Sequence, residues 1–178
     1  LAEGLIYDMF DPQKHVVPTV DRPYTQYYVS IDYGTQNPMA FGLWGYVPPP
    51  TQANPHEFES AWYKIKEYHY DGRAKGRQKT DEEYYHDLVE FVGELPIRSV
   101  IIDPSAASFI ATIRKKGKFA VRKAHNDVLE GIRNVATALN TGRILYNDCC
   151  KETFREFASY VWDEKAAERG EEKPIKQN

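Results

Sequence analysis

Two aspartates stand where short apolar runs of the sequence end. Asp32 follows the run Tyr27–Ile31, and Asp103 follows the run Arg98–Ile102. Runs of about six residues rich in β-branched and aromatic side chains, closed by a turn residue, predict β-strands. A carboxylate buried in an apolar core costs several kcal/mol unless it is paired or bound to a metal, so each aspartate needs solvent or a cation. Capping of a turn is the alternative interpretation of Asp32.

Together the two aspartates could hold a divalent metal. If their strands lie side by side, both carboxylates meet at one edge of the sheet. Two hard oxygen ligands without histidine or cysteine suit Mg²⁺ or Mn²⁺ better than zinc. A pair of such ions about 3.5–4 Å apart promotes in-line attack of water on a phosphodiester, because one ion generates the nucleophile and the other holds the leaving oxygen.

The elements that must position these residues alternate along the chain. We expect strands at 27–32, 39–46, 58–70, 98–103, 119–122 and 144–146, and helices at 80–95, 105–116, 126–140 and 149–162. Thr80 and Glu83 form a capping-box pattern at the first helix, and Ser105 is the expected cap of the second. Strands joined by helices on a mixed sheet give a layered α/β or α+β domain.

Size and composition are those of an ordinary globular protein. The chain has 178 residues, 42% of them hydrophobic and 28% charged, which suits one domain with a buried core. No apolar run reaches the roughly 20 residues that cross a bilayer, and no signal-peptide pattern begins the chain. Cys149 and Cys150 are sequence neighbours, so a structural disulfide between them is disfavoured. We therefore expect an intracellular protein without a membrane segment.

A basic segment at 71–79 is expected to form a mobile loop or hairpin tip before the first helix. The net charge is −3, so any contact with nucleic acid must come from such a local patch. Each phosphate that a cation neutralises adds affinity through counterion release. The candidates for DNA contact are Arg73, Arg77, Lys79 and, after the fifth strand, Lys123. A solvated loop tip is the alternative for the basic segment, and a plain surface position is the preferred interpretation of His125.

The two ends of the chain differ in composition from its middle. Residues 1–24 contain three prolines and no sustained period, so they are expected to be a linker or arm that precedes a domain at 25–178. The proline-rich segment 47–55 is expected to be a surface loop. From Asp163 onward the sequence is charged and poor in apolar residues, which predicts an irregular end.

Four motifs follow one another along the chain. They are Ile31–Pro38 with Gly42–Trp44, then Gly76–Thr80 before a tyrosine-containing helix, then Ile101–Ala106, and finally Asn126–Ile132. In this order and spacing they resemble the nuclease domain of the large terminase subunit of tailed bacteriophages. The segment Leu1–Tyr7 is similar to the one by which that family leaves its ATPase domain. The resemblance covers nearly the whole chain, and its specificity comes from the order and spacing of the set.

The resemblance implies a fold, an activity and two site residues. The implied fold is RNase H-like, with a central mixed five-stranded sheet in which three antiparallel strands are followed by alternating helices and strands. The implied activity is that of an endodeoxyribonuclease, which cleaves double-stranded concatemeric viral DNA during genome packaging with a two-metal Mg²⁺ or Mn²⁺ site. Asp32 and Asp103 match the first two metal-binding, catalytic acids of the family.

A third metal-binding acid, preceded by a histidine, follows in the family on a helix that would lie beyond Asn178. We therefore expect this sequence to lack that C-terminal helix and to bind metal weakly by itself. Asp148 and Asp163 are available carboxylates, but neither is expected to replace the third acid, because acids at turns and helix ends are common.

The resemblance also implies partners and a location. The partners are double-stranded DNA, an ATPase domain of the same polypeptide joined through residues 1–24, the portal protein and the small terminase subunit, with no membrane. The location is the cytoplasm of the infected bacterial host.

Three alternatives stay open at this point. The run Asp32–Thr35 also looks like the phosphate loop of actin-like and sugar-kinase ATPases, although those need two such domains and a second glycine-rich loop. Another RNase H-like nuclease of the resolvase or integrase type would differ in its preferred substrate. A DNA-binding or docking module that does not cut would show no cleavage with any metal.

Overall fold

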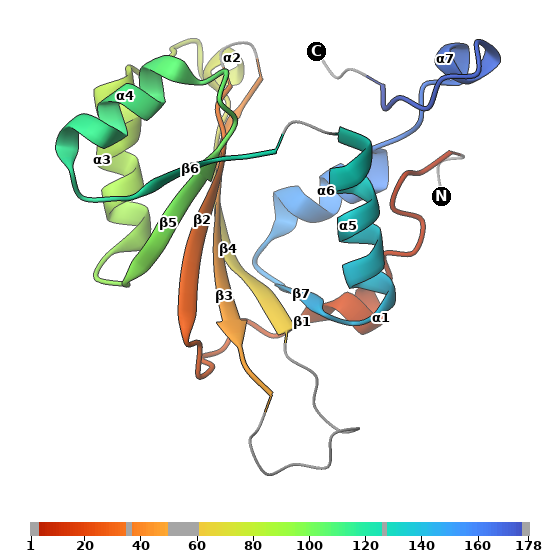
Figure 1. The fold of residues 1–178 in the computed structure, drawn as a ribbon, viewed down its shortest axis with the longest axis horizontal. Coiled ribbons are helices and arrows are strands. Elements are labelled where there is room, and N and C mark those ends of the chain that lie inside the picture. The colour runs from red at the N-terminus through yellow and green to blue at the C-terminus, as the bar shows by residue number, and fades with distance from the viewer. Residues whose placement is uncertain (1–3, 35–36, 50–60, 126–127, 176–178) are drawn as a thin grey trace.

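The computed structural model describes residues 4–34, 37–49, 61–125 and 128–175, and the strands of this part form one mixed seven-stranded sheet (Figure 1). The strands are β1 (Val16–Val17), β2 (Gln26–Asp32), β3 (Met39–Val47), β4 (Ala61–Tyr70), β5 (Ile97–Ile102), β6 (Val121–Lys123) and β7 (Ile144–Asn147). Their order across the sheet is β1-β7-β4-β3-β2-β5-β6. The predicted mixed α/β class is confirmed, with seven strands rather than five because β7 and β1 extend the sheet beyond β4.

Strand direction follows the predicted pattern. β2, β3 and β4 pair antiparallel, whereas β5 joins β2 in parallel and β6 joins β5 in parallel. A parallel pair needs a long crossover. Between β2 and β5 the chain passes through β3, β4 and α3, and between β5 and β6 it passes through α4. The carboxyl ends of β2 and β5 therefore lie at the same edge of the sheet.

The helices of the described residues vary from one turn to more than three turns. They are α1 (Pro12–His15), α2 (Gly72–Lys75), α3 (Asp81–Val92), α4 (Ala107–Lys116), α5 (Val128–Asn140), α6 (Lys151–Ser159) and α7 (Glu164–Glu168). The predicted capping box is present, since the Thr80 side chain accepts from the Glu83 amide and Glu83 returns the contact. The prediction for Ser105 is wrong, because α4 begins after Ala106 and has no side-chain cap.

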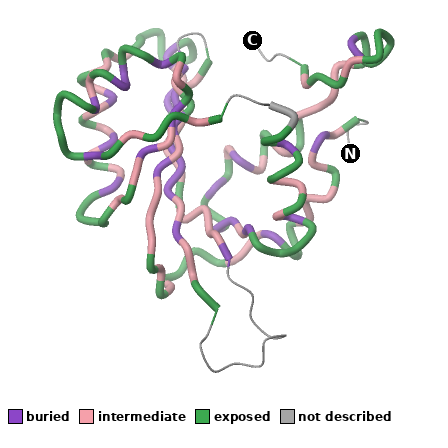
Figure 2. The backbone as a smooth tube through the Cα atoms, viewed as in Figure 1, coloured by how far each residue is buried: buried purple, intermediate pink, exposed green. Residues whose placement is uncertain are grey.

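Two apolar clusters lie on opposite faces of the sheet (Figures 1 and 2). On one face α3 and α4 cover the inward side chains of β2 and β3, where Val29, Phe41, Leu88 and Phe109 are almost fully buried. On the other face α5, α6 and the first residues of the chain pack beside β7. The residues of this second cluster include Leu139, Tyr146, Phe10, Phe154 and Phe157.

Part of the expected arm packs into the domain. β1 pairs with β7, and the buried His15 lies with Nε2 at 2.7 Å from the Leu139 carbonyl oxygen. These contacts explain how a two-residue strand, too short to carry a sequence pattern, joins the sheet. The division at residues 24 and 25 stays a prediction.

Two further segments differ from expectation. The basic segment contains the single-turn helix α2, capped by the Asp71 side chain, where a loop tip was expected. Residues after Asp163 form α7, and the Ile175 amide donates to the Val161 carbonyl, where an irregular end was expected. Most of the proline-rich segment 47–55 and the start of the helix predicted at 126 lie outside the described residues.

Candidate functional site

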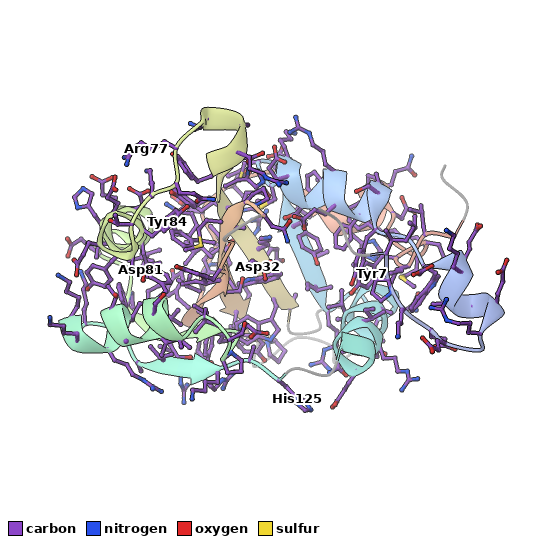
Figure 3. All side chains as sticks on the ribbon, turned by 90° about the horizontal axis from the view of Figure 1, so that it is seen from above. Tyr7, Asp32, Arg77, Asp81, Tyr84 and His125 are labelled. Atoms are coloured by element: carbon purple, nitrogen blue, oxygen red, sulfur yellow. The ribbon has the colours of Figure 1, made fainter. Side chains whose placement is uncertain are left out.

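Asp32 and Asp103 lie at the ends of two neighbouring parallel strands. In the register of β2 and β5, Ile31 is opposite Ile102, so Asp32 is the last residue of β2 and Asp103 follows the last residue of β5. Figure 3 shows Asp32 near the middle of the molecule, between the two groups of helices. The juxtaposition that the sequence predicted is therefore present, while the roles of the two acids stay predictions.

Asp103 is the stronger acid of the two. It is exposed, and its Oδ1 accepts a hydrogen bond of 2.8 Å from the Ser105 amide. Hydrogen bonds from the side chain and backbone of Ser105 lower the pKa of Asp103. This turn uses the serine that was expected to cap α4, and it keeps the carboxylate ionised and fixed in position.

Asp32 lies in a different environment. The residue reaches solvent, but neighbouring protein atoms exclude much of the water around its carboxylate, and this burial raises its pKa. Lys64 opposes the rise and the negative charge of Asp103 adds to it. A bound cation would stabilise the ionised form of Asp32, which is the behaviour expected of a ligand in a partly dehydrated site.

A small cleft adjoins Asp32 between the sheet and α6. Its volume is about 40 Å³, which is on the scale of one water or ion. The polar residues that line it are Ser30, Asp32, Lys64, Glu67, Tyr68, His69, Glu152, Thr153 and Glu156. Carboxylates from three elements thus converge beside the sheet edge at which β2 ends.

A β-bulge in β4 places two of these residues on the same face. The partner of Leu43 is Lys66, but the partner of the next residue, Trp44, is Lys64, so Ile65 is extra. Lys64 and Glu67 are three positions apart and would point to opposite faces of a regular strand. The extra residue re-aims the chain so that both side chains reach the cleft.

Glu67 anchors the start of α6. Its carboxylate accepts from the amides of Glu152 and Thr153 at 3.0 and 3.1 Å and from Thr153 Oγ1 at 2.9 Å. The N-cap residue Cys150 makes no side-chain cap bond, so a strand supplies the cap that the helix itself lacks. Lys64 adds a bond of 2.7 Å from Nζ to Thr153 Oγ1.

Glu156, one turn further along α6, is the acid that sequence reasoning missed. It lines the cleft with Asp32, and burial raises its pKa, with Lys64 lowering it and Asp32 raising it. The apolar residues Phe154 and Phe157 of α6 indicate which helix face is buried, and hence that Glu156 lies off that face. The bulge at Ile65 leaves no such signal in the sequence.

The donors of this edge suit a hard divalent cation. Mg²⁺ is commonly bound through one or two carboxylates together with waters and substrate phosphates, rather than by a cage of protein ligands. Asp32 and Asp103 would supply the two carboxylates. Within the part of the chain that the structure describes, no group of three or more His, Cys, Asp or Glu residues is arranged to hold a metal, so the remaining ligands would be waters and phosphate oxygens.

The candidate DNA contacts lie in separate places. Arg77 is ion-paired with Glu83, and Lys79 Nζ lies 2.6 Å from Asp87 Oδ2, so phosphate would have to compete with these carboxylates. Arg73 on α2 and Lys123 at the end of β6 are exposed. Lys123 is opposite Ile102 and so lies near the aspartate edge.

His125 and the two alternative acids lie elsewhere. His125 is a surface residue, as expected, and its Nε2 lies 3.0 Å from Glu130 Oε2. Figure 3 shows His125 and Arg77 at opposite margins of the molecule. Asp148 accepts a bond of 2.7 Å from Thr19 Oγ1, and Asp163 caps α7. Neither acid lines the cleft beside Asp32.

The fold and the site define an RNase H-like α/β domain with acids at the ends of its central strands. No protein-family model matches the sequence, and the search of curated proteins finds no significant match. No helix among the described residues is long and apolar enough to cross a membrane.

Several solved structures are similar to this chain. The large terminase of a thermophilic bacteriophage, in complex with ADP, is 65% identical over 99% of this chain, with a TM-score of 0.87. The P22 large terminase nuclease domain has a TM-score of 0.69 at 16% identity, covering 98% of this chain and 85% of that domain. The large terminase nuclease of the thermophilic phage G20c with bound magnesium has a TM-score of 0.63 at 12% identity, covering 100% of this chain and 90% of that one.

Over nearly its whole length the chain is similar to a part of a bacteriophage large terminase. It spans 42% of the length of the ADP-bound large terminase, and its fold is that of the P22 and G20c nuclease domains.

Proposed function

We propose that this domain is a metal-dependent endonuclease that cleaves double-stranded, concatemeric viral DNA during genome packaging. The observation that carries the proposal is the placement of Asp32 and Asp103 at the ends of the adjacent parallel strands β2 and β5. The 65% identity to the ADP-bound large terminase supports the biological setting, and the bound magnesium of the G20c nuclease supports a divalent metal.

In this proposal each residue has a defined task. Asp32 and Asp103 would hold Mg²⁺ or Mn²⁺, which supplies Lewis-acid stabilisation and an activated water for phosphodiester hydrolysis, in a two-metal arrangement with the DNA phosphates. The Ser105 amide keeps Asp103 ionised and oriented. Glu67 holds α6, so that Glu156 faces the same cleft as Asp32.

The proposed partners are those that the similarity to large terminases suggests. They are double-stranded DNA, an ATPase domain of the same polypeptide, the portal protein and the small terminase subunit, and the proposed location is the cytoplasm of the infected bacterium. Arg73 and Lys123 are the proposed phosphate contacts with the fewest competing carboxylates, since Arg77 and Lys79 are ion-paired.

The test is cleavage of supercoiled plasmid in EDTA, Mg²⁺ and Mn²⁺. We expect nicking and linearisation with either metal, none in EDTA, and loss of both in Asp32→Asn. Asp148→Asn removes an exposed carboxylate outside the cleft and should cut like the parent. No cleavage by the folded parent with either metal would favour a DNA-binding module that does not cut. A preference for branched over linear duplex DNA would favour a resolvase-type nuclease.

A further inference from the structure

A second cavity lies on the same face of the sheet as Asp32, under α5. Its volume is about 550 Å³, within the range of small-molecule sites. The sheet lines it with four aromatic side chains, Tyr28, Trp44, Tyr46 and Trp62. The α5 helix lines it with Asn134, Thr137 and Ala138, and Thr141, directly after the helix, also lines it.

The two walls differ in chemistry. On the sheet side, the Trp62 ring lies 5.4 Å from that of Tyr28 and 5.0 Å from that of Tyr46, so the aromatic surface is continuous. On the helix side, hydroxyl and amide groups can hydrogen-bond. The exposed Arg122 adds a positive charge at the boundary, with its guanidinium 5.8 Å from the centre of the Tyr28 ring. Aromatic stacking, polar edge contacts and a cation together suit a nucleobase with its phosphate.

The cavity is continuous with the aspartate edge. Every second side chain of a strand points to the same face of the sheet. One face of β2 therefore carries Tyr28, Ser30 and Asp32 in succession. Ser30 lines both the cavity and the small cleft, and its Oγ accepts a bond of 2.9 Å from Trp44 Nε1. At about 3.4 Å per residue, Tyr28 and Asp32 lie roughly 14 Å apart along the strand, which corresponds to a short length of extended nucleic acid.

We propose that this cavity binds unpaired nucleotides of the DNA strand whose phosphate lies at Asp32. The proposal rests on the nuclease function proposed above and adds a substrate class. Bases of an intact duplex are paired and stacked on one another, so the cavity would favour DNA that is single-stranded, gapped or frayed beside the cleavage site.

Binding in EDTA tests the proposal without cleavage. We would measure fluorescence anisotropy with labelled oligo-dT and with a blunt duplex of the same length, for the parent chain, Trp62→Leu and Arg122→Gln. The parent should bind oligo-dT more tightly than the duplex. Each variant should weaken oligo-dT binding about fivefold or more, since one stacked base or one phosphate contact has at least that effect.

Arg114→Gln is the matched control, because it removes the same charge from α4 on the opposite face of the sheet (Figure 1). It should bind like the parent. If Trp62→Leu unfolds, Thr137→Phe fills the cavity from the exposed surface of α5 and should block oligo-dT binding instead. The proposal would be overturned if Arg122→Gln and a folded cavity variant, either Trp62→Leu or Thr137→Phe, bound oligo-dT like the parent. It would also be overturned if the parent showed no preference for oligo-dT over the duplex.

The plasmid assay separates this result from the nuclease proposal. If the parent cuts plasmid and the cavity variants bind oligo-dT normally, only the substrate inference fails. If the parent binds oligo-dT through the cavity but cuts nothing, the nuclease function fails and the nucleotide site remains.

Discussion

At the level of single residues, the site depends on a contrast between two aspartates. Ser105 holds the pKa of Asp103 below its ordinary value, whereas burial raises the pKa of Asp32. Environments that shift the pKa values of two neighbouring acids in opposite directions are typical of catalytic pairs, because each acid then has its own protonation state and task. In the proposed site, the ionised Asp103 would bind a cation, and that cation would stabilise the ionised form of Asp32.

Glu156 gives the first prediction. Glu156→Gln removes the carboxylate that shares the cleft with Asp32, so metal-dependent plasmid cleavage should fall by roughly 10–100-fold, as for other residues that support a metal site. Initial nicking rates in Mn²⁺ measure the effect.

The control for Glu156→Gln is Glu168→Gln, which makes the same replacement of a carboxylate by an amide at an exposed position of α7. A nicking rate of Glu156→Gln equal to that of this control would remove Glu156 from the site.

At the level of helices and strands, the position of α6 depends on Glu67 of β4. Replacing Glu67 by Gln keeps the shape of the side chain but weakens three hydrogen bonds to the helix start. Hydrogen bonds to charged groups contribute about 1.5–3 kcal/mol each, so the free energy of unfolding should fall by roughly 1–3 kcal/mol.

Urea denaturation measures this change as a lower midpoint at an unchanged slope. Glu164→Gln, in the first turn of α7, is the matched control. An unchanged midpoint in Glu67→Gln would show that α6 is held by its apolar contacts alone.

The start of α3 gives a pH-dependent prediction. The hydrogen bond from Arg77 is the main cause that lowers the pKa of Glu83 from 4.5 to about 2. Because the folded pKa lies below the unfolded one, the ionised Glu83 stabilises the fold above about pH 4.5, and this contribution disappears as pH falls toward 2. Glu83→Gln keeps a capping-box residue but loses the ion pair.

The expected result is a lower melting temperature of Glu83→Gln at pH 7 and a difference that shrinks between pH 4.5 and 2. Melting curves followed by circular dichroism at several pH values check it. The same difference at pH 7 and pH 2 would mean that the Arg77 pair has no part in it.

Local sequence patterns predicted the presence of helices and strands better than the residues at which these helices and strands begin and end. The capping box at Thr80 and the strand-end position of Asp103 follow from residue types a few positions apart, so the sequence contains them. Strand β1 and the bulge at Ile65 depend on contacts with β7 and β3, which are far away in sequence. For that reason Glu67 could not be assigned to the site before the structure was known. The phenylalanines of α6 indicate the helix face on which Glu156 lies, but not that this face adjoins Asp32.

In the molecule as a whole, an apolar cluster packs on each face of the sheet, and the polar cleft beside Asp32 lies on the same face as α6. The cluster under α3 and α4 fixes β2 and β5, and thereby Asp32 and Asp103. The cluster around Tyr146 fixes α6, and thereby Glu156. The acids consequently belong to two packing units that both include residues of β3, and the proposed site depends on both being folded.

The proposed nuclease requires that Asp32 and Asp103 together hold a divalent metal, and Mn²⁺ binding followed by electron paramagnetic resonance measures this property directly. We predict weak, saturable binding to the parent chain, loss of that binding in both Asp32→Asn and Asp103→Asn, and retention in Asp148→Asn. Parent-like Mn²⁺ binding by either of the first two folded variants would contradict a shared metal site.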